Sequence, residues 1–155
     1  MKPDIRALHG AELEGALDAV ARLRIDVFRD WPYLYDGDLY YERRYLRSYI
    51  DSADAILVGA FDGSRLVGAA TGTPMEDHAA ELGAPLTAAG YALTDVFYCA
   101  ESVLLAPYRG QGVGHAFFDL REDHARRLGR RWSAFCAVIR PETHPETHPA
   151  RPADY

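Results

Sequence analysis

The feature that most constrains the fold of this chain is a glycine-rich turn between an apolar run and an amphipathic stretch. Residues 94–105 are β-branched, aromatic and aliphatic, which is typical of a long buried strand. From residue 112 to 128 apolar side chains recur at helical spacing, with charged residues between them. A third apolar run, 132–139, predicts a strand that returns parallel to the first one after the helix. The turn carries three alternating glycines, Gly110, Gly112 and Gly114.

The chain before this unit predicts the rest of a mixed α/β fold. Apolar positions three or four residues apart indicate two helices, and two β-prone runs around an Asp-Gly turn indicate an antiparallel hairpin. Residues 30–38, which contain proline and glycine, predict a loop, and the Ala-rich residues 75–90 predict an irregular or partly helical insertion. The predicted strand, two helices and two hairpin strands occupy, in chain order, residues 5–8, 11–29, 38–50, 55–61 and 65–73.

Length and composition indicate one compact domain and a tail. The chain has 155 residues, of which 48% are hydrophobic and 26% charged, enough for one core. We expect the domain to span residues 1–140 and a Pro-rich tail to span 141–155, because its repeated Pro-Glu-Thr-His forbids helix and central strand. His144 and His148 have the i, i+4 spacing of metal ligands, but the prolines prevent the helix that would align them. We therefore expect no metal site.

Charge and hydropathy exclude two classes of partner. The net charge is -6, whereas proteins that neutralise nucleic-acid phosphates usually carry an excess of basic residues. No apolar run approaches the roughly 20 residues that a membrane-spanning helix needs. The first residues lack the pattern of a secretory signal, so we expect a cytoplasmic protein with no nucleic-acid or membrane partner. Cys99 and Cys136 lie in apolar settings and are predicted to be buried thiols.

The glycine-rich turn is the main candidate for a binding site. A strand that runs into such a turn leaves unpaired N–H groups at the positive end of the following helix. The glycines let a phosphate approach these groups, and Arg109 adds a charged donor. A P-loop is excluded because no Gly-Lys-Ser/Thr follows, and the glycine spacing differs from the Gly-x-Gly-x-x-Gly of dinucleotide-binding folds. The turn therefore predicts a phosphate site of another kind.

The pattern Arg-x-x-Gly-x-Gly after a strand that ends in proline resembles the acyl-CoA signature of the GNAT superfamily of N-acyltransferases. The order of elements predicted over residues 3–140 also follows that family. The resemblance implies a mixed, splayed sheet with helices on both faces. It also implies an acetyl-CoA-dependent N-acetyltransferase that moves an acetyl group to a primary amine of a small molecule or protein. The matching residues are Val103, Leu105, Pro107, Arg109, Gly110, Gly112 and Gly114.

The same resemblance assigns residues to acetyl-CoA. The backbone of the central strand would pair with the pantetheine arm, and the turn would hold the pyrophosphate. His115, on the first turn of the helix, either touches a phosphate or is a partly exposed helix histidine. The residues so assigned are Val103, Leu104, Leu105, Arg109, Gly110, Gln111, Gly112, Val113, Gly114 and His115.

For the chemistry, the resemblance implies that Glu101 is the general base that takes the amine proton. The alternative is that Glu101 pairs with an arginine or binds substrate. Asp95, six residues earlier, is a second candidate, and the period of a strand predicts that it shares a face with Glu101. Tyr155 is the candidate general acid, with Tyr98 or water as alternatives.

In this family the acceptor binds near the first two helices and their connecting loop, and the resemblance places it there. That region is aromatic and acidic, which suits a cationic amine by charge and cation–π contact. The alternative is that the aromatic side chains pack on the core and cover the sheet. The candidate residues are Phe28, Trp31, Tyr33, Tyr35 and Asp36.

The sequence departs from the family's pattern after residue 140. We expect the two C-terminal strands of the family to be missing, and the sequence contains no asparagine. An uncovered sheet edge invites pairing with another chain, so a homodimer is a hypothesis. A non-catalytic CoA-binding sensor or interaction module of the same fold is the alternative to an enzyme.

Overall fold

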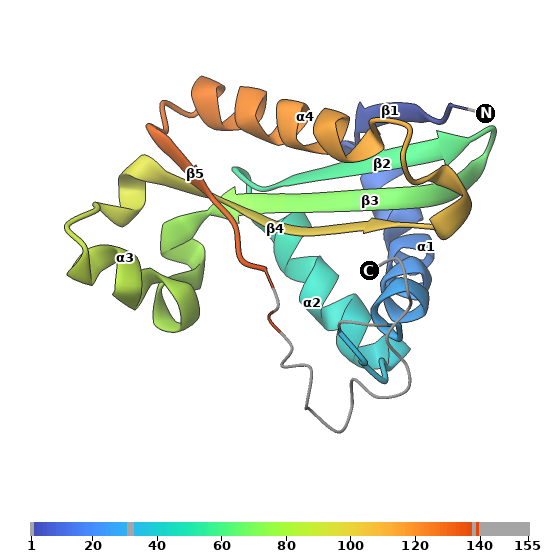
Figure 1. Ribbon diagram of the computed structural model, residues 1–155, viewed down its shortest axis with the longest axis horizontal. Coiled ribbons are helices and arrows are strands. Elements are labelled where there is room, and N and C mark those ends of the chain that lie inside the picture. Colours follow the sequence, from blue (N-terminus) through green and yellow to red (C-terminus); the bar gives the residue numbers. More distant parts are fainter. Residues whose placement is uncertain (1, 31–32, 138, 140–155) are drawn as a thin grey trace.

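The protein folds around one open five-stranded sheet. The computed structural model describes residues 2–30, 33–137 and 139, and the strands lie in the order β1-β2-β3-β4-β5. Neighbouring strands are antiparallel except β4 and β5, which are parallel as the sequence predicts (Figure 1). The strands are β1 (Asp4–Ala7), β2 (Ile56–Asp62), β3 (Arg65–Pro74), β4 (Val96–Leu104) and β5 (Trp132–Ala134).

Helices cover both faces of the sheet, as expected. Helices α1 (Gly10–Phe28) and α2 (Leu39–Asp51) lie on one face, and α4 (Val113–Arg127) lies along the other (Figure 1). The insertion between β3 and β4 forms short helical turns and α3 (Ala84–Ala88), and it projects beyond one end of the sheet. Asp38 begins α2 because its side chain accepts a hydrogen bond from the backbone N–H of Tyr40.

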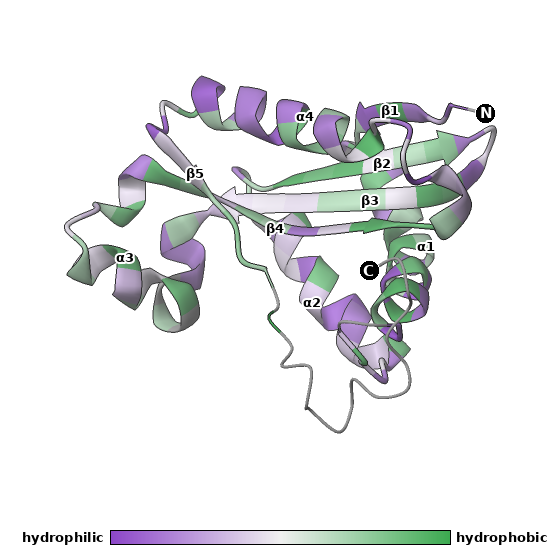
Figure 2. Ribbon diagram, in the orientation of Figure 1, coloured by the Kyte–Doolittle hydropathy of each residue, from purple (hydrophilic) through white to green (hydrophobic). Residues whose placement is uncertain are grey.

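Two apolar layers hold these elements together, one on each face of the sheet. Phe117 of α4 packs in the first layer with Val58 of β2, and Leu46 of α2 packs in the second with Leu57 of β2. Neighbouring residues of β2 thus pack in opposite layers, which is the two-residue alternation expected of a strand that is buried on both faces. Figure 2 shows the same division, with hydrophobic strands between helices whose outer surfaces are hydrophilic.

A β-bulge interrupts β4 at the centre of the sheet. Ala70 lies opposite Ser102, but Gly72 lies opposite Cys99, so β4 has one more residue than β3 between these pairs. Before the bulge, Cys99 packs in the layer under α4, and after it Val103 packs in the layer under α1 and α2. Both residues are odd-numbered and would share a face in a regular strand, so the bulge shifts the alternation of side chains by one residue. Glu101 is the second of the two bulge residues, Ala100 and Glu101, and it shares the face of Val103.

The structure corrects two predictions, one about the position of Asp95 and one about the end of β5. Asp95 does not lie on β4 but ends the helical turn before it (Leu93–Asp95), and the shifted alternation removes the reason to place it beside Glu101. Strand β5 ends at Ala134 and not at residue 139, because the chain leaves the edge of β4 after three paired residues.

Because the chain leaves the edge of β4 after Ala134, only one of the two predicted buried thiols is buried. Cys99 is buried on β4, as predicted, but Cys136 lies after the end of β5 and is exposed, so that part of the prediction is wrong. Both cysteines are free thiols. Of the helices within the described residues, none has the length and apolar character to cross a membrane. The predicted tail at 141–155 lies outside the described residues.

Candidate active site

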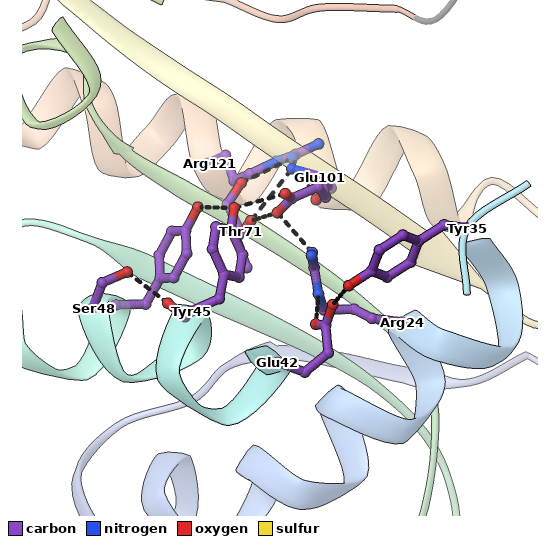
Figure 3. A network of polar contacts seen from close by, with 9 residues as sticks. Arg24, Tyr35, Glu42, Tyr45, Ser48, Thr71, Glu101 and Arg121 are labelled. Carbon is purple, nitrogen blue, oxygen red and sulfur yellow. Dashed lines mark hydrogen bonds and ion pairs between the residues drawn. The ribbon is translucent and has the colours of Figure 1, made fainter. Parts of the chain in front are cut away.

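Glu101 occupies the centre of a polar network between the sheet and the first two helices (Figure 3). The Tyr45 hydroxyl donates to its Oε1 at 2.6 Å, and the Thr71 hydroxyl donates to its Oε2 at 2.9 Å. Arg24 Nη1 lies 3.0 Å from the same Oε2 as an ion pair, without the alignment of a hydrogen bond. The Glu101 side chain is 26% exposed. It is therefore an oriented carboxylate that a ligand can still reach.

Arg24 joins Glu101 to a second carboxylate that is fully buried. Its Nε donates to Glu42 Oε2, and the Tyr35 hydroxyl donates to Glu42 Oε1 at 3.2 Å. The side chains of Arg24 and Glu42 are 8% and 0% exposed. Burial alone would lower the pKa of the Arg24 guanidinium, but the charges of Glu101 and Glu42 outweigh burial and raise that pKa above its usual value. The group is a permanent cation between two anions.

Aromatic rings surround the Arg24 guanidinium. Its central carbon lies 4.6 Å from the ring centroid of Tyr45 and 5.1 Å from that of Phe28, both within cation–π range. These rings come from α2 and α1, so the guanidinium also links the two helices. These ring contacts compensate for the hydration that the Arg24 guanidinium loses on burial.

Two phenols extend the network from Glu101 along α2. The hydroxyls of Tyr45 and Tyr49 are 3.0 Å apart, and because Tyr45 donates to Glu101, it accepts from Tyr49. Burial and the nearby charge of Glu101 raise the pKa of Tyr45, and burial chiefly raises the pKa of Tyr49. Both phenols therefore stay neutral donors, which fixes the orientation of the Glu101 carboxylate.

Arg121 holds the backbone of Glu101 from the opposite face of the sheet. This α4 residue is 1% exposed, and its Nη1 donates to the carbonyls of Thr71 and Glu101 at 3.1 and 3.2 Å. Its Nη2 donates to the Ser102 hydroxyl at 2.9 Å. The bulge takes these carbonyls out of the regular ladder, and Arg121 satisfies them. Burial lowers the pKa of this guanidinium.

Two cavities meet at Glu101. The first, of about 340 Å³, lies beside α1 and α2, and the second, of about 370 Å³, lies beside β4. They share the side chains of Tyr33 and Glu101. The first cavity is lined by Arg24, Phe28, Tyr33, Tyr35, Tyr41, Glu42, Tyr45 and Glu101. The second is lined by Tyr33, Tyr98, Cys99, Ala100, Glu101, Ser102, Phe118, Arg121, Phe135 and Cys136.

The second cavity lies where β4 and β5 separate. The two strands pair only from Val96–Tyr98 to Trp132–Ala134, so within the described residues the rest of this edge of β4 has no neighbouring strand. An unpaired edge offers backbone donors and acceptors to an extended ligand. Strand β4 ends at Leu104, shortly before the glycine-rich turn.

The turn itself is an open cradle at the start of α4. Gly110 and Gly112 have φ values of +75° and +81°, which side chains disfavour, and Gly112 is the N-cap of the helix. A Cβ atom at Gly110, Gly112 or Gly114 would meet nothing within 4 Å. The first N–H groups of a helix have no partner within it, and this first turn carries no acidic side chain. The cradle therefore fits a phosphate or pyrophosphate.

The predicted residues of the turn lie around this cradle. Arg109 donates through Nε to the carbonyl of Leu104 at 3.1 Å, which ties the end of β4 to the turn. Gln111 donates to the carbonyl of Pro107 at 3.3 Å. His115 is exposed on the first turn of α4. Val103 is buried in the layer under α1 and α2, and Val113 in the layer under α4.

The structure brings together only part of the set predicted around the acceptor and the acid. Phe28, Tyr33 and Tyr35 line the first cavity, while Asp36 is exposed and does not line it. Tyr98 lines the second cavity. Trp31 and Tyr155, like the His144 and His148 pair, lie outside the described residues. Among the residues the structure does describe, no cluster of His, Cys, Asp or Glu could hold a metal ion.

Sequence reasoning missed the residues that form the polar network around Glu101. The missed residues are Arg24, Glu42, Tyr45, Thr71 and Arg121. Two of them left a signal: Arg24 and Glu42 stand at positions of the apolar stripes of their helices, where a charge must find a partner. Which partner each finds depends on the tertiary fold.

Comparison with known proteins identifies a family over most of the chain. The sequence model of the acetyltransferase (GNAT) family matches residues 18–145. A search of curated protein sequences found no significant match.

Solved structures of low sequence identity share the fold. Aminoglycoside N-acetyltransferase AAC(6')-Iy, in complex with CoA, is 16% identical with a TM-score of 0.66, covering 94% of this chain and 79% of that one. AAC(6')-Ih from Acinetobacter baumannii is 16% identical with a TM-score of 0.64, covering 88% and 80%. Ribosomal-protein-alanine N-acetyltransferase from Brucella melitensis biovar Abortus is 22% identical with a TM-score of 0.59, covering 92% and 84%.

Proposed function

Because this chain belongs to the acetyltransferase (GNAT) family, an acetyl-CoA-dependent family, we propose that it moves the acetyl group directly to a primary amine within a ternary complex. The amine belongs to a small molecule or to a protein. One observation carries the proposal: Glu101 stands where the two cavities meet. A base at that junction can serve an amine from one side and a thioester from the other.

The proposed acetyl-CoA site extends from the turn to Glu101. We assign the pyrophosphate to the cradle of residues 109–115, and the pantetheine arm to the unpaired edge of β4 at Val103, Leu104 and Leu105. The fit rests on the open space above the glycines and on the cavity between β4 and the segment after β5. When bound there, acetyl-CoA supplies an acyl group activated as a thioester.

We assign the general base to Glu101. A carboxylate has about four acceptor sites, and the hydrogen bonds from Tyr45 and Thr71 use two of them. Glu101 can therefore accept an ammonium N–H directly or through one water, and it deprotonates the amine for attack. The contacts to both oxygens fix the orientation of this carboxylate, which lines both cavities.

The departing thiolate needs a proton, for which Tyr155 remains the predicted donor. Tyr98, which lines the second cavity, is the alternative among the described residues. Tyr45 is unsuited to this role because its proton is already donated to Glu101. Replacing each of Tyr98 and Tyr155 by Phe in separate variants, with kcat measured, distinguishes the two donors.

The acceptor site is the first cavity, beside α1 and α2. Phe28, Tyr33 and Tyr35 contribute to its walls, so the aromatic residues both pack on the helices and face the cavity. A cationic amine would meet Glu101 at its inner end.

The decisive experiment is thiol release from acetyl-CoA in the presence of an amine panel, with Glu101→Gln beside the wild type. We expect wild-type turnover and loss of that turnover in Glu101→Gln, with CoA affinity retained. A sensor or interaction module would instead bind CoA and release no thiol with any amine. Failure to bind CoA would contradict both functions.

We propose that residues 1–140 form one domain and that two copies of it form a homodimer. Trp132 on β5 is 50% exposed at the last strand of the sheet, and such an edge can pair with a second copy. Light scattering at micromolar protein tests this: a monomeric mass contradicts it.

We further propose that the protein works in the cytoplasm. Its two cysteines are free thiols, one of them exposed, which suits a reducing compartment. Cell fractionation with an antibody tests the location, and recovery from an oxidising compartment would contradict it.

A further inference from the structure

We infer that the first cavity selects an acceptor with a single positive charge on a compact aromatic or apolar body. The inference rests on the proposed acetyl transfer and narrows its acceptor. It follows from the charges, the walls and the size of the cavity beside α1 and α2.

Among the described residues that line this cavity, only one carboxylate is available to a ligand. Two line it, but Glu42 is fully buried and holds Arg24 and the Tyr35 hydroxyl. Glu101, 26% exposed, is the anion that an ammonium group can reach. One accessible carboxylate can neutralise one ammonium group.

A second ammonium group would meet an unfavourable charge. The Arg24 guanidinium lines the same cavity and is held there by Glu42 and Glu101. Like charges repel more strongly beside a buried group such as Arg24 than in bulk water. A diamine or a polyamine sugar would therefore bring one cation to Glu101 and leave the others near Arg24 or without a partner.

The walls suit the rest of a small apolar amine. Five of the eight lining residues are aromatic, and the Phe28 and Tyr45 rings already pack against Arg24. Tyr33, Tyr35 and Tyr41 add apolar ring surface. The volume of about 340 Å³ is near the lower end for small-molecule sites, roughly 300–1,000 Å³. The cavity thus fits one ring and a short amine chain better than a multi-ring sugar.

The start of α2 offers a matched pair of variants. Tyr41 lines the cavity and is 57% exposed, so Tyr41→Asp adds a second carboxylate at the cavity without disturbing the core. Tyr40, its neighbour, is 68% exposed and does not line the cavity. Tyr40→Asp is therefore the control with the same charge change in the same turn. An acidic residue in the first turn of a helix is well tolerated.

The test compares 2-phenylethylamine, 1,4-diaminobutane and the aminoglycoside tobramycin as acceptors. We expect the wild type to favour 2-phenylethylamine at least about tenfold in kcat/KM over either polyamine. Tyr41→Asp should shift the ratio at least about threefold toward 1,4-diaminobutane, and Tyr40→Asp should leave it unchanged. Equal use of a polyamine by the wild type, or equal shifts in both variants, would overturn the inference.

Equilibrium binding separates this inference from the proposed function. Binding of the same three amines to the CoA complex, followed by protein fluorescence, needs no turnover. Preferential binding of 2-phenylethylamine that Glu101→Gln abolishes would support the acceptor class even if no acetyl group moves, in which case the proposed transfer is wrong. Binding without preference would overturn the acceptor class whether or not transfer occurs.

Discussion

Arg121 donates to the main-chain carbonyl of Glu101 at 3.2 Å from the helix on the face opposite to Arg24 and Tyr45, which hold the Glu101 carboxylate. Two buried arginines therefore fix one residue, one by its backbone and the other by its side chain. Glu101 is held at a bulge, where regular strand pairing could not hold it.

Replacing Glu101 by Gln should lower kcat about 100-fold or more, because the amide cannot accept the amine proton. The amide oxygen can still accept the hydrogen bond from Thr71, and the amide NH2 can donate to the Tyr45 hydroxyl, so the variant should fold. Steady-state thiol release measures the change, and calorimetric titration with CoA should give an unchanged Kd. Full activity in the variant would remove Glu101 from the base role.

Replacing Gly114 by Asp should separate folding from cofactor binding. The new side chain meets nothing within 4 Å, and an acidic residue in the first turn of α4 stabilises the helix. The same charge repels the pyrophosphate, so the Kd for CoA should rise at least about tenfold while Tm does not fall. Gly15→Asp in the first turns of α1, also with open space, is the control and should leave CoA binding unchanged.

Replacing Arg24 by Met should destabilise the protein by about 3–5 kcal/mol, because Glu42 is left as a buried charge without its cation. The double variant Arg24→Met with Glu42→Gln should recover most of this loss in urea unfolding. Arg24→Lys keeps the charge and should retain more stability than Arg24→Met. If the single and double variants are equally unstable, the buried pair is not the cause.

The ion pair between Glu76 and Arg130 should stabilise the folded protein by an amount that is lost at acidic pH. The Arg130 hydrogen bonds lower the pKa of Glu76 below its usual 4.5, so the pair stabilises the fold above that pH and the contribution is lost as the pH falls through the folded-state pKa. Because the pair is partly exposed, the increment should be at most about 1 kcal/mol. Glu76→Gln should lower Tm slightly at about pH 7 and not at about pH 3.

Bound CoA should protect one thiol from labelling. Cys136 is exposed and lines the second cavity, whereas Cys99 is buried and burial raises its thiol pKa. A maleimide should therefore label Cys136 first, and saturating CoA should slow that step at least about fivefold if the pantetheine arm lies in this cavity. The Cys136→Ser variant should lose the fast phase. Labelling unaffected by bound CoA would place the arm elsewhere.

The helices, the hairpin and the glycine-rich turn could be predicted because their signals are local. Gly112 caps α4 and the Asp-Gly turn joins β2 and β3, and each of these follows from residues close in sequence. The end of β5 could not be predicted, since a strand lasts only as long as its neighbour stays beside it, and β4 and β5 separate after Ala134.

Only part of the site could be predicted, again because local signals are visible in the sequence whereas tertiary contacts are not. Glu101 and the turn follow from one contiguous motif, whereas Arg24 and Glu42 are 18 residues apart and meet Glu101 only through the packing of two helices on the sheet. Glu101 does form an ion pair with an arginine, Arg24, and the pair is part of the site. The prediction for Asp95 failed because counting by two along a strand takes no account of a bulge.

The extra residue in β4 shifts, by one position, the alternation of side chains between the two faces of the strand. If β4 kept regular alternation through Ala100, Glu101 would follow Phe97 and Cys99 into the apolar layer under α4, where Phe117 packs, and away from Tyr45 and Arg24. The chemical role of Glu101 thus depends on the backbone geometry of the bulge as well as on its own identity.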